Sequence, residues 1–307
     1  STPLYSSAAS DVYKRQVISK IERIRMVGSA FHKTGRPVAF VPLTTGVHAG
    51  HIALVRAAKR IRGAVTVVAL QSPREEDLEL LRAEGVDIVW NYSVETLWPH
   101  GRRIAVSPAN AEATLEPELS KDATLYLALI LTLSPTDVLL GEKDYELLLA
   151  IHHAVQDFHL GVRVQGVPAV RMPDGVVMSL RNTNVPAAVR EQAAALSAAL
   201  TAGAHAAEAG AEQVREVAAE VLSAAGVEPE YLEVRGRDLG NPPAEGDARL
   251  LVAATIGGVR LIDNVGLPLG IGFNNIEEHE AKAELEREQQ RALQRAQGTA
   301  SQQLSED

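Results

Sequence analysis

The stretch that most constrains the fold is residues 38–59, VAFVPLTTGVHAGHIALVRAAK, in which a strand, a glycine turn and a helix follow one another. Its apolar opening, residues 38–43, predicts a buried parallel strand. Residues 48–60 carry apolar side chains at helical spacing and end in two basic residues, which predicts a helix. Such a unit points backbone N–H groups and the positive end of the helix dipole at one place. Phosphate is the ligand that such a place holds.

Two histidines, His48 and His51, lie at the predicted start of this helix. They offer hydrogen-bond donors without a fixed negative charge, and a protonated one could stabilise charge that develops on a phosphoryl group. The alternatives are that the histidines have a purely structural role or that the pair binds a metal ion. Because no carboxylate or cysteine follows at ligand spacing, we expect no protein-held metal and interpret the pair as part of a nucleotide site.

Strand and helix patterns alternate through the first half of the chain. Apolar runs predict further strands at 65–70, 86–90, 138–140 and 162–170, with residues 104–106 as a weaker candidate. Helical patterns cover residues 17–33, 75–84, 124–133 and 146–157. This alternation predicts an α/β fold with a parallel sheet and helices on both faces.

The composition and the periodic pattern of the sequence change in the second half of the chain. Alanine-rich helical patterns at 187–209 and 212–224 are followed by predicted strands at 231–234, 249–256 and 259–265, the last two joined by Gly257-Gly258. We therefore expect four parts: a non-native leader at 1–16, a nucleotide-binding domain at 17–172, a smaller α+β domain at 173–273, and a polar helical or disordered tail at 274–307. Residues 11–16 resemble a translated adaptor sequence left in sequencing reads, which is why the leader is set aside.

Composition excludes several classes of function. The net charge is −9 and no basic stripe interleaves with aromatic residues, so a nucleic-acid partner is not expected. No stretch approaches the length of a membrane span, so we expect no membrane partner. The chain has no cysteine, which excludes thiol catalysis and disulfides and fits the reducing cytoplasm where we expect the protein.

Three short motifs occur in order: HAGH at 48–51, GEKDY at 141–145 and MSLRN at 178–182. Together they resemble the pantothenate synthetase (pantoate–β-alanine ligase) family, within the nucleotidyltransferase group that includes class I aminoacyl-tRNA synthetases. The likeness covers most of residues 17–269. It implies a Rossmann-like, nucleotidyltransferase-type sheet and a homodimer. The implied reaction joins pantoate and β-alanine through an acyl-adenylate, using ATP with its Mg²⁺ and releasing AMP and pyrophosphate.

The resemblance also implies which residues form the site. The candidate catalytic residues are His48, His51, Lys143 and Arg181. The candidate nucleotide contacts are Pro42, Thr44, His48, Gly50, His51, Gly141, Lys143, Asp144, Val170, Met178, Ser179 and Arg181. In this interpretation Lys143 touches the phosphates, Asp144 holds the ribose, and the MSLRN segment clasps the phosphates as it closes. The alternatives are a surface ion pair for Lys143 with Asp144 and a solvated turn for Arg181.

The residues expected to bind pantoate depart from the family pattern. Where the family has N-P-x-Q-F, this chain has Ser72-Pro73 followed by Arg74-Glu75, and Gln71 falls too early to match. The family's K-D-Y-Q-Q ends here in Glu146-Leu147. Gln71, Glu75 and Glu146 are the remaining candidate substrate residues. Because a carboxylate that faces the substrate acid is repulsive, the alternative is a divergent paralogue that binds ATP but uses another acid, or an inactive one with a binding or regulatory role.

Overall fold

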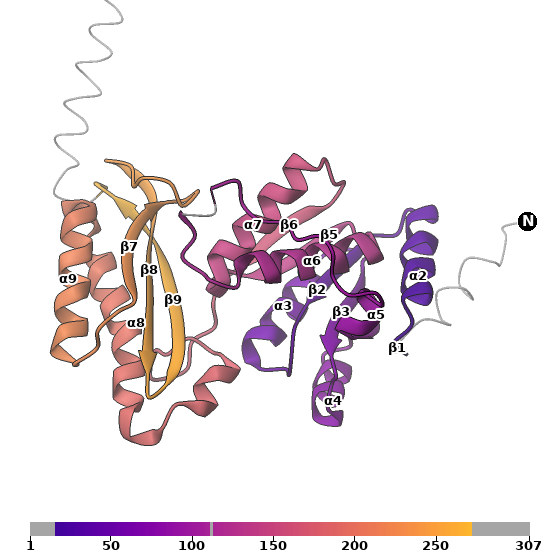
Figure 1. Ribbon diagram of the computed structural model, residues 1–307, viewed down its shortest axis with the longest axis horizontal. Helices are drawn as coiled ribbons and strands as arrows, with labels where there is room; N and C mark the ends of the chain where they lie inside the picture. The colour runs from indigo at the N-terminus through magenta and orange to yellow at the C-terminus, as the bar shows by residue number, and fades with distance from the viewer. Residues whose placement is uncertain (1–15, 111–112, 272–307) are drawn as a thin grey trace, which may run out of the picture.

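A computed structural model gives the fold of residues 16–110 and 113–271, in which two sheets organise the chain (Figure 1). The first sheet has six parallel strands in the order β1-β4-β3-β2-β5-β6. Their bounds are β1 (Gln16–Ile18), β2 (Val38–Pro42), β3 (Val65–Gln71), β4 (Ile88–Tyr92), β5 (Asp137–Gly141) and β6 (Arg163–Val167). The predicted α/β fold class is confirmed.

Helices cover both faces of this sheet. On one face, α2 (Ile21–Lys33), α6 (Leu119–Leu133) and α7 (Tyr145–Asp157) bury a cluster that includes Trp90 and Tyr92. On the other, α3 (Ala49–Lys59) and α4 (Glu75–Ala83) enclose a second cluster, while the short α5 (Val94–Leu97) follows β4. Strands buried on both faces need apolar residues at every position, which is why they appear in the sequence as continuous apolar runs.

The strand order reverses between β2 and β5. These two strands are parallel neighbours, with Ala39 opposite Asp137 and Phe40 opposite Val138. The chain continues from β2 to β3 and β4 on one side, whereas β6 lies on the other side of β5. In open α/β sheets, ligands bind beyond the carboxyl ends of the strands at such a reversal. HAGH follows β2 and GEKDY includes the end of β5, so the topology brings the two motifs to the same crevice.

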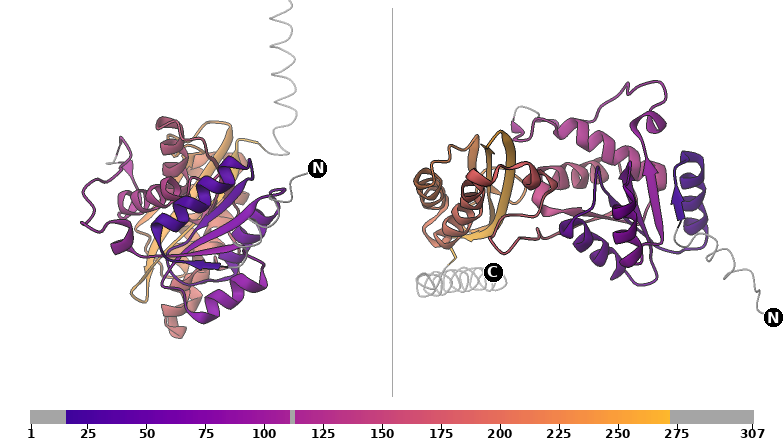
Figure 2. Two further views of the ribbon diagram at one scale, coloured as in Figure 1. Left: turned by 90° about the vertical axis from the view of Figure 1, so that its right-hand side faces the viewer. Right: turned by 90° about the horizontal axis from the view of Figure 1, so that it is seen from below.

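The second sheet is smaller and antiparallel, in the order β7-β8-β9. Its strands are β7 (Tyr231–Gly236), β8 (Gly246–Ile256) and β9 (Val259–Leu269), and α8 (Arg190–His205) and α9 (Ala211–Ala224) pack on it around a hydrophobic cluster of its own. Gly257 and Gly258 have φ values of +58° and +82°, which suit the tight β8–β9 turn. Figure 2 shows this part beside the six-stranded sheet from two further directions. The boundary at residue 173 stays a prediction.

Two local predictions differ from the structure in the kind of element formed, beyond shifts in the ends of other elements. The helix expected at 17–33 begins only at Ile21, because residues 16–18 form β1 and pair with Ile88 to Trp90 of β4. Gln16, which we assigned to the leader, is thus part of the sheet. Residues 104–106 form no strand: the N–H of Val106 donates to Thr124 Oγ1 and its carbonyl accepts from Ser120 Oγ, both on α6.

The remaining predictions on the chain's ends lie outside the described residues: the leader up to residue 15 and the whole tail at 274–307. Within 16–110 and 113–271, no helix combines the length and apolar character needed to cross a membrane.

Candidate functional site

A cleft of about 840 Å³ lies between the two parts of the molecule. It is lined by the segments that follow β2 and β5, by α6, by residues 167–181 and by β8 and β9. All twelve candidate nucleotide contacts line it: Pro42, Thr44, His48, Gly50, His51, Gly141, Lys143, Asp144, Val170, Met178, Ser179 and Arg181. The structure therefore brings the three motifs to one cavity, although HAGH and MSLRN begin 130 residues apart in the chain.

His48 caps the N-terminus of α3. Its Nδ1 accepts a hydrogen bond from the N–H of Gly50 at 3.1 Å, so a neutral His48 carries its proton on Nε2. The ring stacks on that of His51, with 3.7 Å between centroids. A β-carbon on residue 50 would lie 2.8 Å from Cε1 of His48, so this arrangement requires glycine there.

The loop before the histidines is held from three sides. The buried carboxylate of Asp77 accepts from the N–H of Val47 at 2.8 Å, and Tyr92 donates to the carbonyl of Leu43 at 3.0 Å. On the third side, Leu180 of MSLRN packs on Gly46, whose φ is +63°. Asp77 lies in the first turn of α4, and nothing in its local sequence indicates this contact with the loop.

Both histidines favour the neutral form in this site. Burial, together with the nearby charge of Lys143, lowers the pKa of His48. Burial and the neighbouring His48 lower the pKa of His51 to about 3. A protonated imidazole, which the sequence suggested as one option, is therefore disfavoured in the ligand-free cleft. The imidazoles can still donate N–H groups to phosphate oxygens, and a bound triphosphate would raise both pKa values.

Lys143 and Asp144 belong to the 3-10 turn Glu142–Asp144 directly after β5. Lys143 Nζ lies 3.4 Å from Asp144 Oδ1, which is a long contact for an ion pair, and the Lys143 side chain is only 17% exposed. This arrangement leaves the ammonium group available to a ligand in the cleft.

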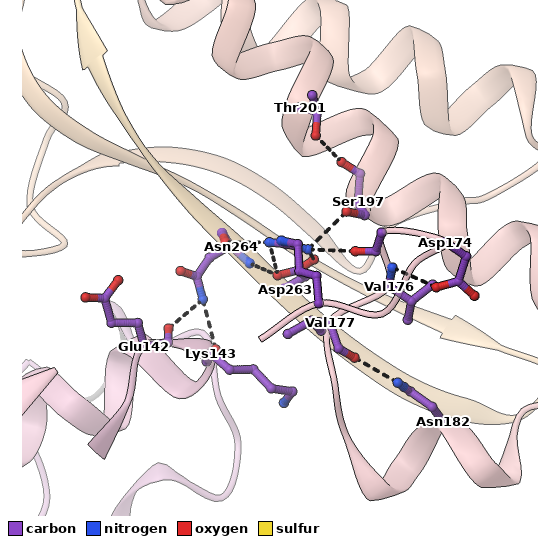
Figure 3. Close-up of polar contacts among 12 residues, drawn as sticks. Glu142, Lys143, Asp174, Val176, Val177, Asn182, Ser197, Thr201, Asp263 and Asn264 are labelled. Atoms are coloured by element: carbon purple, nitrogen blue, oxygen red, sulfur yellow. Dashed lines mark hydrogen bonds and ion pairs between the residues drawn. The ribbon is translucent and has the colours of Figure 1, made fainter. Parts of the chain in front are cut away.

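The MSLRN segment closes the opposite side of the cleft. Ser179 Oγ accepts from the N–H of Arg181 at 3.2 Å and begins the 3-10 turn Leu180–Asn184. The Asn182 amide donates to the carbonyl of Val177 at 2.8 Å, which fixes the base of this turn (Figure 3). Arg181 itself makes no side-chain hydrogen bond or ion pair with the residues that the structure describes.

The three candidate substrate residues are not equally placed. Gln71 lines a separate, smaller hollow beside Ser72 and Arg74, and Glu75 pairs with Arg82 at 2.6 Å on the surface of α4. Neither lines the main cleft. Glu146 does, but its carboxylate accepts from the N–H groups of Leu115 and Glu116 at 3.0 Å and 2.8 Å. The structure therefore brings none of them to the cleft as a free hydrogen-bonding group.

Two further cleft residues, Asp122 and Tyr126, were not proposed from the sequence. They are four residues apart on α6, so they share one face of that helix. The Asp122 side chain makes no hydrogen bond or ion pair within residues 16–110 and 113–271, and burial raises the pKa of its carboxyl. The detectable signal was a carboxylate and a phenol at i,i+4 spacing near the start of a largely apolar helix.

The donor set suits a metal ion that arrives with a nucleotide. Among the described residues there is no group of three or more His, Asp or Glu that could form a metal cage. Mg²⁺ keeps several waters and is commonly held through substrate phosphates. The cations and N–H groups around the cleft fit a triphosphate that brings its own ion.

The family model described as pantoate-beta-alanine ligase matches residues 16–266. This chain belongs to the pantoate–β-alanine ligase family. A pantothenate synthetase of Corynebacterium jeikeium (strain K411) is 41% identical over 285 residues, spanning 86% of this chain and 93% of that protein. One of Nocardia farcinica (strain IFM 10152) is 42% identical over 265 residues, spanning 80% and 83%.

Solved structures of the family agree with this membership. A pantothenate synthetase from Thermus thermophilus matches with a TM-score of 0.72 and 29% identity, covering 81% of this chain and 98% of that one. A pantoate-beta-alanine ligase from Francisella tularensis, described as complexed with beta-gamma ATP and beta-alanine, matches with a TM-score of 0.66 and 25% identity, covering 81% and 96%. The nucleotidyltransferase-like fold expected from the motifs is confirmed.

Proposed function

We propose that this protein is an ATP-dependent ligase that condenses pantoate with β-alanine through an acyl-adenylate. One observation carries the proposal: His48, His51, Lys143 and Arg181, from three separate motifs, line one cleft at the reversal of strand order. The membership of the family and the ATP and β-alanine named for the Francisella ligase support it. Homodimer formation and a cytoplasmic location stay predictions.

In the first step, a carboxylate oxygen of the acid attacks the α-phosphorus of ATP. The bond between the α-phosphorus and the bridging oxygen breaks, and pyrophosphate leaves with the electron pair. His48 and His51 donate N–H groups to phosphate oxygens, and the N-terminus of α3 adds its dipole. Lys143 and Arg181 balance the charge that moves onto the leaving group. These residues contribute position and charge stabilisation only.

In the second step, the neutral amine of β-alanine attacks the acyl carbon of the adenylate. The carbon–oxygen bond to AMP breaks, the amine loses a proton to solvent, and an amide remains. When bound with ATP, Mg²⁺ would neutralise charge on the phosphates during the first step. We expect Asp144, at the exposed end of the Glu142–Asp144 turn in the cleft, to accept hydrogen bonds from the ribose.

Exchange of labelled pyrophosphate into ATP tests this function. We expect exchange that requires pantoate and does not require β-alanine, because only the first step is reversible without the amine. Full turnover should then release AMP and not ADP. ATP binding with no exchange in the presence of pantoate would contradict the proposal.

A second candidate is a ligase of the same mechanism that activates an acid other than pantoate. The specific observation in its favour is the cleft wall on α6 and α7. There Asp122 has no hydrogen-bond or ion-pair partner among the described residues, and Leu147 stands where the family pattern has glutamine. A carboxylate there repels the carboxylate of a small hydroxy acid. Exchange assays with a panel of acids decide between the two candidates, since the true substrate supports exchange at the lowest concentration.

A further inference from the structure

Two consecutive residues of β9, Asp263 and Asn264, reach both segments that carry the proposed phosphate contacts. The Asn264 amide donates to the carbonyls of Glu142 and Lys143, at 3.0 Å and 2.8 Å. Figure 3 shows Asn264 directed at this turn from the neighbouring strand. The turn is therefore held by a residue more than 100 positions later in the chain, across the boundary between the two sheets.

The orientation of the Asn264 side chain is fixed by a hydrogen bond to its amide oxygen. Its Oδ1 accepts from Arg249 on β8, so Nδ2 must face the two carbonyls. Arg249 in turn pairs with Glu142 Oε2 at 3.2 Å and lies 3.7 Å above the Tyr145 ring. The Asn264 amide is thus paired at both its nitrogen and its oxygen, and such hydrogen-bonded networks favour a single geometry.

Asp263 holds the second segment. Its carboxylate accepts two hydrogen bonds from the Arg171 guanidinium, at 2.6 Å and 3.0 Å, and Arg171 also donates to Ser197 Oγ on α8. Arg171 begins the stretch that leads to Ser179 and Arg181, and it bridges to Val177 across that stretch. The Asp263 carboxylate is 3% exposed, whereas the Arg171 side chain is 32% exposed, so the carboxylate end of this ion pair is the part shielded from solvent.

We propose that Asn264 is a positioning residue for nucleotide binding: it fixes the backbone turn that carries Lys143 and sets that turn relative to the MSLRN segment, which its neighbour Asp263 holds. The inference rests on the proposed function, since Lys143 is the proposed phosphate contact. Asn264 does not need to touch the substrate. It acts through the two carbonyls, and misplacement of a positioned group by about 1 Å can cost roughly a hundredfold in rate.

The test compares Asn264→Asp and Asn264→Ala with an interdomain control, Arg235→Gln. Arg235 donates to the carbonyl of Ala113 at 3.1 Å across the same boundary but does not touch the turn. Asn264→Asp keeps the shape and places an oxygen against two carbonyl oxygens. We expect both Asn264 variants to raise the calorimetric Kd for ATP by about tenfold or more. Arg235→Gln should leave it within about twofold.

Hydrogen exchange provides a second readout. The amides of residues 142–146 should exchange faster in the Asn264 variants than in the wild type, while those of β2 and β3 should not change. If Asn264→Asp does not fold, Arg249→Lys decides: Arg249 uses separate nitrogens for Asn264 and Glu142, lysine has only one nitrogen to offer, and the change should shift Kd in the same direction.

Unchanged ATP affinity in folded Asn264 variants overturns this inference and leaves the proposed function standing. A wild-type protein that does not bind ATP overturns the proposed function and the inference with it.

Discussion

Nδ1 of His48 accepts the N–H of Gly50, two residues further along the chain, at 3.1 Å. The hydrogen bond caps α3 and leaves Nε2 of His48 as the protonated nitrogen. A histidine that served only as a cap could be replaced by asparagine or serine at little cost to the helix. The position of both histidines on the cleft wall points instead to a role for the remaining N–H.

Removing either imidazole should stop adenylation. We expect His48→Ala and His51→Ala each to lower the rate of pyrophosphate exchange by about a hundredfold or more, the typical effect of losing one donor to a charged transition state. His153→Ala is the matched control, because His153 lies exposed on α7 and away from the cleft. Rates within about twofold of wild type in both cleft variants would remove the histidines from the mechanism.

Neutralising Asp122 should favour a carboxylate substrate. Asp122→Asn removes a negative charge from the cleft, so we expect KM for pantoate to fall by about threefold to tenfold. Asp157→Asn makes the same change in net charge at the exposed end of α7 and should not alter KM. If Asp122→Asn raises KM instead, the carboxylate contributes to binding, and the acid substrate carries a group that it attracts.

The depressed pKa of His51 should make stability depend on pH. The pKa of His51 is 6.5 in the unfolded chain and about 3 in the fold, so between these values the unfolded chain binds more protons. The free energy of unfolding should therefore fall as pH decreases from about 6.5 towards 3, with a contribution of at most about 1.4 kcal/mol per pH unit from this residue. Urea titrations of the wild type and His51→Asn at several pH values measure it. Parallel pH profiles would contradict the assignment.

The crossing of α2 and α6 gives a prediction on stability alone. A β-carbon on Gly28 would lie 1.9 Å from the backbone oxygen of Leu133, which cannot move without shifting α6. We expect Gly28→Ala to lower the free energy of unfolding by about 1–3 kcal/mol or more. Gly161→Ala is the control, since a β-carbon there meets nothing within 4 Å. Chemical denaturation of the two variants should separate them clearly.

The strands of the first sheet could be predicted from the sequence because each is buried on both faces. Apolar runs such as residues 65–70 carry that information locally. β1 could not be predicted in this way, because three residues have no measurable period and its pairing depends on β4, some 70 positions away. Residues 104–106 gave the opposite error: their apolar character suggested a strand, but side chains of α6 satisfy the Val106 backbone.

The parts of the site that lie within a sequence motif could be predicted. The contacts that residues far away in the sequence make with those motifs could not. HAGH follows β2 and GEKDY begins at the end of β5, and these strands are parallel neighbours, so the convergence of the two motifs follows from the fold. Asn264 and Arg249 act on GEKDY from a different sheet, and nothing in their local sequence indicates that contact. Glu146, which the sequence offered as a substrate residue, lines the cleft, but its use by the backbone of residues 115 and 116 depends on contacts with a distant segment of the chain.

The three-residue strand β1 also covers an edge of β4 that would otherwise be unpaired. It occupies the free side of β4, whose N–H and carbonyl groups it pairs from Ile88 to Trp90. A shortened protein that began at Ile21 would keep every cleft residue but would uncover that row of main-chain groups on a strongly apolar strand. Uncovered strands of this kind recruit other chains and seed aggregates. We therefore expect a protein trimmed at its N-terminus to stay soluble only if it keeps β1, which begins at Gln16 and lies far from the site of the chemistry.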